Sequence, residues 1–94
     1  MDETILKPLR DEIDTLDEEI VRLLGLRVQI VRKVADMKHR NDLSVVQPNR
    51  MTVVLDKAEA LGRKNNVKPS VVRHIYSTLI DYAQELEQEI IDDK

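Results

Sequence analysis

The chain has 94 residues, 35% of them charged and 41% hydrophobic, with a net charge of −3, no Cys, Trp or Phe, and only two Gly. The lack of Cys excludes a disulfide framework and a Cys-ligated zinc. No apolar run in the sequence approaches the roughly 18 residues of a membrane span. The chain also lacks the positive charge and the aromatic side chains that are typical of a nucleic-acid-binding protein. Without a membrane span or thiols, the chain is expected to be cytoplasmic. Because two glycines leave little room for hairpins, we expect one nearly all-helical domain over residues 1–94.

The first predicted element is a long helix from Pro8 to Arg40, in which Pro8 takes the first turn, where its missing N–H costs least. Its apolar residues recur at spacings of three and four, which is typical of one narrow packed seam. These residues are Leu6, Leu9, Ile13, Leu16, Ile20, Leu23, Ile30, Val34 and Met37. Such a helix is roughly 50 Å long, whereas a compact chain of this size has a radius of gyration of roughly 12 Å. We therefore expect a partner chain to cover the seam.

Two shorter helices follow. Pro48 starts the second helix, which Gly62 can end, although residues 63–66 can carry another turn. The apolar face of this helix consists of Met51, Val54, Leu55, Ala58 and Leu61. Pro69 opens the third helix, and the tail over residues 91–94 is expected to fray. The main apolar stripe of the third helix consists of Val72, Ile75, Leu79, Tyr82, Leu86 and Ile90. The predicted fold is all-α, with one long and two shorter helices.

Two cations of the long helix do not fit a purely structural account. Arg27 occupies a seam position; alone, it is as well explained by a register-setting charge, or by a side chain whose stem packs while its head reaches water. Lys38 lies about 20° around the helix and roughly 16 Å along its axis, so the two side chains can grip one small dianion. A buried cation needs a counter-charge, and an anionic ligand is one way to supply it.

Three further charged residues have both a functional and a plain explanation. Arg10 lies roughly 25 Å from Arg27 along the helix, so only an antiparallel partner helix brings it to the same ligand; otherwise it is a surface residue paired with Asp14. Arg50 stands in the first turn of the second helix, where the dipole favours an acid, which indicates either a nearby anion or a solvated side chain. Glu87 flanks the stripe of the third helix and is either solvated or, if buried beside an anion, a protonated hydrogen-bond donor.

These residues belong to one longer pattern: Leu9-Arg10 followed by residues 11–17, Leu23 to Arg27, Val34, Met37-Lys38 and Pro48-Asn49-Arg50. The pattern resembles the all-helical AroQ class of chorismate mutases, and the resemblance runs from about Leu6 to Glu87. It implies an intertwined homodimer with two equivalent active sites that the two chains share.

The resemblance also implies a role for each cation. Arg10 of one chain and Arg27 of the other would bind the two carboxylates of a dianionic substrate. Lys38 would reach a carboxylate and the ether oxygen of the breaking bond, and Arg50 would help to order the site. Arginines suit bidentate carboxylates, while a lysine supplies a compact charge to one oxygen.

A Claisen rearrangement of chorismate to prephenate suits a chain with few reactive groups. It requires the substrate to be held in its compact conformer and positive charge to be placed where the C–O bond breaks. It needs no nucleophile, metal or cofactor, so no cofactor is expected. His39 and His74 lack the spacing of metal ligands and are predicted to be surface residues.

Three positions depart from the common mutase pattern. Gln47 stands where typical members carry an Asp, Met51 where a Glu usually accepts from the C4 hydroxyl, and Glu87 where bacterial enzymes often use a Gln to donate to the ether oxygen. Glu87 must be protonated for that role, in which it would be catalytic together with Lys38. Gln47, Met51 and Ala83 would contact the substrate. This combination resembles the branch that acts on 4-amino-4-deoxychorismate and feeds antibiotic precursors.

We therefore predict a chorismate-mutase-type isomerase acting on chorismate or on its 4-amino-4-deoxy analogue. Two alternatives remain open at this point. The isochorismate pyruvate lyase of salicylate synthesis shares the scaffold and also lacks a Glu near position 51. A non-catalytic helical dimerisation or regulatory module would explain the seam, but not Arg27 and Lys38 together.

Overall fold

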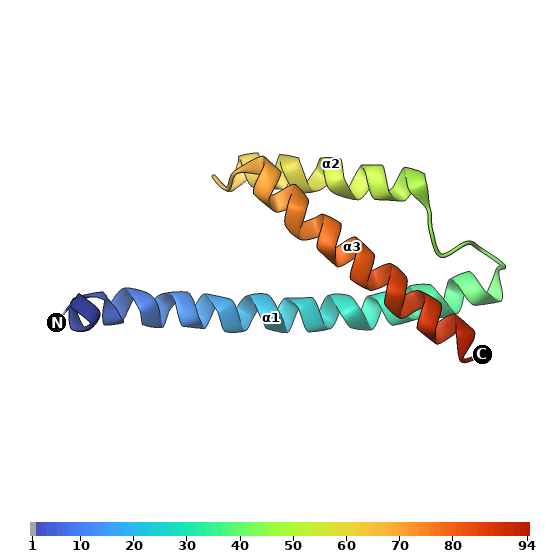
Figure 1. Cartoon of the computed structure of the whole chain (residues 1–94), viewed down its shortest axis with the longest axis horizontal. Coiled ribbons are helices and arrows are strands. Elements are labelled where there is room, and N and C mark those ends of the chain that lie inside the picture. Colours follow the sequence, from blue (N-terminus) through green and yellow to red (C-terminus); the bar gives the residue numbers. More distant parts are fainter. Residues whose placement is uncertain (1) are drawn as a thin grey trace. The chain divides into compact units, whose positions relative to one another are not determined.

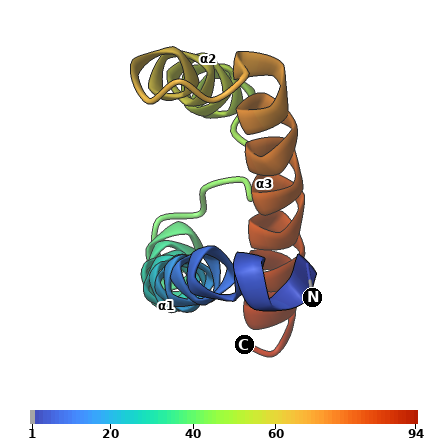
Figure 2. The ribbon, with the colours of Figure 1, turned by 90° about the vertical axis from the view of Figure 1, so that its left-hand side faces the viewer.

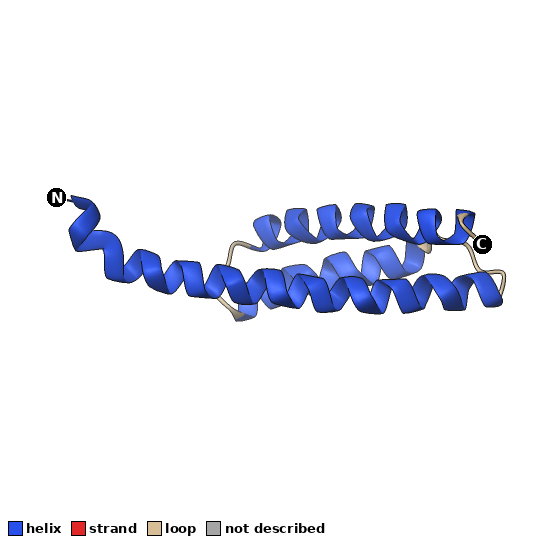
Figure 3. Cartoon of the chain, turned by 90° about the horizontal axis from the view of Figure 1, so that it is seen from below, coloured by secondary structure: helices blue, strands red, loops and turns tan. Residues whose placement is uncertain are grey.

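The computed structural model describes residues 2–94, and within this range it contains three helices and no strand (Figures 1 and 3). Helix α1 spans Asp2–Arg40, α2 spans Pro48–Lys64 and α3 spans Pro69–Asp92. The predicted all-α fold with one long and two shorter helices is therefore confirmed. None of these helices combines the length and the apolarity needed to span a bilayer. The chain divides into two compact units, residues 1–30 and residues 31–94.

Helix α1 begins at Asp2, so the prediction that Pro8 takes its first turn is wrong. A proline inside a helix removes one backbone hydrogen bond and bends the helix, and Figure 3 shows a bend near the N-terminal end. Side chains one turn and two turns apart pair across the proline. Lys7 Nζ lies 2.9 Å from Asp11 Oδ2, and Arg10 pairs with Glu3. These contacts favour the additional turns before Pro8.

The seam of α1 is exposed in the single chain, as its length predicts. In the N-terminal unit, five of its apolar side chains are between 51% and 62% exposed. They are Leu9, Ile13, Leu16, Ile20 and Leu23. Soluble monomers rarely leave a continuous apolar stripe of this extent in water.

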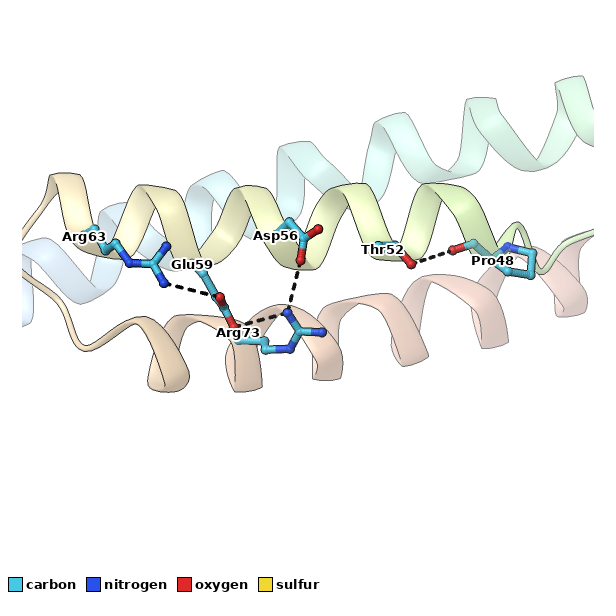
Figure 4. A network of polar contacts seen from close by, with 6 residues as sticks. All are labelled: Pro48, Thr52, Asp56, Glu59, Arg63 and Arg73. Atoms are coloured by element: carbon cyan, nitrogen blue, oxygen red, sulfur yellow. Dashed lines mark hydrogen bonds and ion pairs between the residues drawn. The ribbon is translucent and has the colours of Figure 1, made fainter.

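Helices α2 and α3 pack against each other in the C-terminal unit and are joined by a short turn (Figures 1 and 2). The small buried core of this unit consists of Ala35 from α1, Ala58 from α2, and Ile80 and Leu86 from α3. A polar bridge supports the α2–α3 contact: Arg73 Nη1 lies 3.2 Å from Glu59 Oε1 and 3.5 Å from Asp56 Oδ1 (Figure 4). The main stripe of α3 is covered unevenly, since Leu86 is 8% exposed whereas Ile75 and Tyr82 are about half exposed.

Two residues in the left-handed region end α1 and α2. They are Asp42, with φ of 52°, and Asn66, with φ of 58°. After each of them the next N–H returns to a carbonyl five residues earlier, from Leu43 to Lys38 and from Val67 to Gly62, both at 2.9 Å. This is the Schellman arrangement, which satisfies carbonyls at the end of a helix. Gly62 thus lies inside α2, and the longer of the two predicted ends is the one observed.

Helix α3 continues to Asp92, so the predicted fraying of Ile91 and Asp92 is wrong. Lys94 Nζ lies 2.9 Å from Asp36 Oδ1 on α1. The hydrogen bond and the positive charge of Lys94 lower the pKa of the Asp36 carboxyl. This contact helps to hold the last turn of α3 against α1.

The two glycines provide a matched test of the packing between α2 and α3. A Cβ at Gly62 would lie 3.0 Å from the Val67 carbonyl oxygen and 3.0 Å from Val72 Cγ2, whereas a Cβ at Gly25 would meet nothing within 4 Å. Gly62→Ala should therefore lower the free energy of unfolding by about 1–3 kcal/mol. Gly25→Ala should raise it by up to about 1 kcal/mol, because alanine is the better helix former. Urea titrations at equal protein concentration measure both changes, and an unaffected Gly62→Ala variant would contradict the described contact.

Candidate active site

The predicted site residues of the C-terminal unit come from all three helices. Lys38 lies in the last turn of α1, Gln47 precedes α2, and Met51 lies near the start of α2, while Ala83 and Glu87 lie on α3. All five are buried or half-buried. Arg50, in the first turn of α2, is exposed. The five sheltered residues are the basis of the candidate site.

Lys38 and Glu87 form an ion pair at the centre of this region. The Glu87 residue is only 5% exposed, so the structure decides between the two explanations of this residue in favour of burial. Lys38 Nζ lies 2.7 Å from Glu87 Oε1. The buried Oε1 accepts no hydrogen bond, so the contact is an ion pair. Lys38 donates its hydrogen bond to the Val45 carbonyl oxygen instead, at 2.7 Å.

The counter-charge of Lys38 is thus supplied by the chain itself. The sequence analysis had named an anionic ligand as one way to supply it. Removing two charges from water costs several kcal/mol each, and their attraction compensates for this only while they stay paired. An anion that approaches Lys38 has to compete with the Glu87 carboxylate.

A second contact between side chains lies on the neighbouring turn of α3. Gln84 Nε2 donates to Met51 Sδ at 3.3 Å and so connects α3 to the start of α2. Gln84 lies three residues before Glu87, and side chains at this spacing are neighbours on a helix surface. The sequence analysis did not select Gln84. Its spacing from Glu87 is the signal by which it could have been found.

Gln47 is turned toward the loop that precedes α2. Its side-chain amide donates to the Ser44 carbonyl oxygen at 2.8 Å, and its backbone carbonyl oxygen accepts from the Met51 N–H at 3.0 Å. Pro48 follows it at the first helical position and has no N–H to satisfy. Gln47 therefore orders the entry into α2, and its predicted contact with substrate stays a prediction.

Arg10 and Arg27 belong to the N-terminal unit. Arg10 is half exposed and pairs with Glu3, so the alternative that paired it with Asp14 is wrong. The reason is that α1 extends beyond Pro8, which places Glu3 two turns before Arg10 on the same face of the helix. Arg27 is half-buried. That these two arginines share a ligand with Lys38 stays a prediction.

The two histidines are exposed, as predicted. They are His39, in the last turn of α1, and His74, on α3. Neither is among the residues that hold the Lys38–Glu87 pair in place. The sheltered polar groups of the candidate site are therefore the Lys38 ammonium, the Glu87 carboxyl group and the half-buried amides of Gln47 and Gln84.

Residues 9–88 match the family model of type II chorismate mutases, and the chain belongs to this family. A bifunctional chorismate mutase/prephenate dehydratase of Aquifex aeolicus is 34% identical over 88 residues, which are 90% of this chain and 24% of that protein. A chorismate mutase of Methanocaldococcus jannaschii is 24% identical over 94% of this chain and 89% of its own length. A 4-amino-4-deoxychorismate mutase of Streptomyces venezuelae is 27% identical over 80% of this chain and 73% of its own length.

The relatives differ in the share of their own length that this chain matches. The chain spans about a quarter or less of the length of the bifunctional relatives, 24% in Aquifex aeolicus and 20% in one Buchnera aphidicola strain. It spans most of the relatives named as chorismate mutase or 4-amino-4-deoxychorismate mutase. The similarity to the bifunctional proteins is therefore confined to one part of them.

The Lys38–Glu87 pair makes a prediction about stability. Lys38→Met leaves a buried carboxylate without its partner and should lower the free energy of unfolding by about 3 kcal/mol. Adding Glu87→Gln to that variant should restore most of the loss, because the unpaired charge is then gone. Urea unfolding of both single variants and the double variant measures the coupling. Lys7→Met, which breaks the exposed pair with Asp11, is the control and should have a much smaller effect. Purely additive single effects would contradict the coupling.

Proposed function

We propose that the chain is a chorismate-mutase-type isomerase that rearranges chorismate to prephenate, or 4-amino-4-deoxychorismate to 4-amino-4-deoxyprephenate. The observation that carries this proposal is the family match over residues 9–88, which includes a sheltered lysine that contacts α3 and the loop before α2. The similarity to a chorismate mutase along 89% of that protein's length supports it further.

The proposed reaction requires the protein mainly to position the substrate and to supply positive charge. One C–O bond breaks and one C–C bond forms within the same molecule, and no proton or electron leaves it. The barrier falls when the flexible dianion is held in its reactive conformer and when positive charge meets the ether oxygen. The Lys38 side chain is only 13% exposed, and a charge sheltered from water acts more strongly on a neighbouring oxygen.

We assign the two members of the buried pair to the ether oxygen. A substrate carboxylate or the ether oxygen replaces Glu87 as the partner of Lys38. Glu87 in its protonated form would donate a hydrogen bond to the same oxygen. Arg10, Arg27 and Arg50 would hold the carboxylates, since guanidinium groups bind them in a bidentate manner.

The same proposal includes a homodimer in which a second copy covers the seam of α1. The exposed apolar side chains of the N-terminal unit support it, because a partner helix with the same stripe removes them from water. An antiparallel partner would also carry its own Arg10 toward Arg27, with which it is proposed to share the substrate. The site would then be complete only in the dimer.

The activity is tested by incubating the protein separately with chorismate, 4-amino-4-deoxychorismate and isochorismate. Substrate and rearranged product share one mass, so chromatography and NMR identify the products, and a pyruvate assay detects lyase activity. We expect rearrangement of at least one of the first two compounds. Arg27→Ala and Lys38→Ala should each lower kcat/KM by about a hundredfold or more, while Lys57→Ala, an exposed cation of α2, should not. A folded protein that rearranges neither compound would refute the proposal.

The shared site is tested by mixing two inactive variants. When Arg10→Ala and Lys38→Ala proteins are refolded together, each mixed dimer contains one site with both residues intact, so about a quarter of all sites should regain activity. The matched control mixes Arg27→Ala with Lys38→Ala. These residues are expected to serve the same site from the same chain, so this mixture should stay inactive. Equal behaviour of the two mixtures would contradict an Arg10 acting across chains.

A further inference from the structure

The side-chain amide of Gln84 has an unusually poor hydrogen-bond partner. It is half-buried, and its Nε2 donates to the thioether sulfur of Met51 at 3.3 Å. A thioether is a weak acceptor, much poorer than a carbonyl, a hydroxyl or a carboxylate. A ligand with a stronger polar group can therefore replace this contact at small cost.

The neighbouring polar side chains are committed elsewhere. Glu87, three residues further along α3, holds Lys38 at 2.7 Å. The Gln47 amide donates to the Ser44 carbonyl at 2.8 Å. Gln84 is thus a neutral amide beside a charged pair, and it retains an Oε1 that accepts and an N–H that donates.

The two proposed substrates differ in one ring substituent. 4-Amino-4-deoxychorismate carries an amine where chorismate carries a hydroxyl. The carboxylates of either compound are drawn to the arginines and to Lys38, so this remaining substituent needs a neutral or negative partner. A hydroxyl both donates and accepts, whereas an amine protonated at neutral pH only donates.

We propose that Gln84 contacts this substituent and sets the preference of the enzyme between hydroxyl and amine. Its Oε1 accepts from either group, and its Nε2 moves from the Met51 sulfur to a hydroxyl oxygen when one is present. Met51 contributes an apolar wall that offers neither group a strong partner. This inference rests on the proposed function and names the specificity residue of the same site.

The test compares Gln84→Glu and Gln84→Leu with the unmodified protein on chorismate and 4-amino-4-deoxychorismate. A carboxylate at position 84 forms a charge-assisted hydrogen bond with the amine, so Gln84→Glu should shift the kcat/KM ratio toward the amine substrate by about tenfold or more. Gln84→Leu should lower kcat/KM for the preferred substrate by about tenfold. It should also bring the ratio closer to one.

Gln88→Glu is the matched control. Gln88 lies one turn further along α3, is exposed, and donates to Asp92 at 2.8 Å. The Gln88→Glu variant adds the same charge to the same helix. It should leave the kcat/KM ratio of the two substrates within about twofold, because an exposed charge is screened by water. Equal ratios for the unmodified protein, Gln84→Glu and Gln84→Leu would overturn the inference while leaving the proposed function intact.

The dissociation constants of the two compounds, measured by calorimetry on the same variants, separate the two proposals. If the protein binds both compounds but rearranges neither, the proposed function fails, and the ratio of dissociation constants then decides the role of Gln84. A shift of that ratio toward the amine in Gln84→Glu would support the contact. An unchanged ratio, or a chain that binds neither compound, would overturn it.

Discussion

The contact between Lys38 and Glu87 is the interaction on which the candidate site depends. It joins the last turn of α1 to α3 through two charges sheltered from water, 2.7 Å apart. Lys38 also holds the Val45 carbonyl, so the loop that leads into α2 is tied to the same ammonium. Since neither charge is stable in this place without the other, the pair keeps the last turn of α1, the loop before α2 and α3 together. The chain thus supplies the counter-charge of Lys38 from its own Glu87.

The exposed seam of α1 sets a second constraint. Its apolar residues are spaced for packing, yet those of the N-terminal unit stay about half exposed in the single chain. The buried core of the C-terminal unit is small and built largely from alanine, isoleucine and leucine. A second copy that covers the seam would add apolar burial that the single chain lacks. Under this proposal, assembly and completion of the site are one event, because the helix that covers the seam also carries Arg10.

Most of the helical architecture was predictable, and the errors have local causes. Pro48 and Pro69 begin helices as predicted, because a proline at the first helical position has no N–H to satisfy. Pro8 does not, because pairs such as Lys7 with Asp11 favour helix on both sides of it. Lys38 was selected from its spacing to Arg27, whereas Gln84 was not selected, because no periodicity shows that its amide meets a sulfur 33 residues away. Contacts between helices depend on crossing positions that a sequence pattern does not contain.

The sequence by itself determined the helical class, the seam of α1, and the choice of Arg10, Arg27, Lys38 and Arg50 as candidate cations. It also determined the resemblance that the family match then confirmed. These properties follow from spacing along one chain, where the period of the helix relates position to direction. Only the tertiary structure decided that Glu87 is buried, that it serves as the counter-charge of Lys38, and that Gln84 faces Met51. Burial and pairing depend on which helix faces which, so a residue such as Glu87 stays ambiguous between a solvated acid and a buried one until its neighbours are in place.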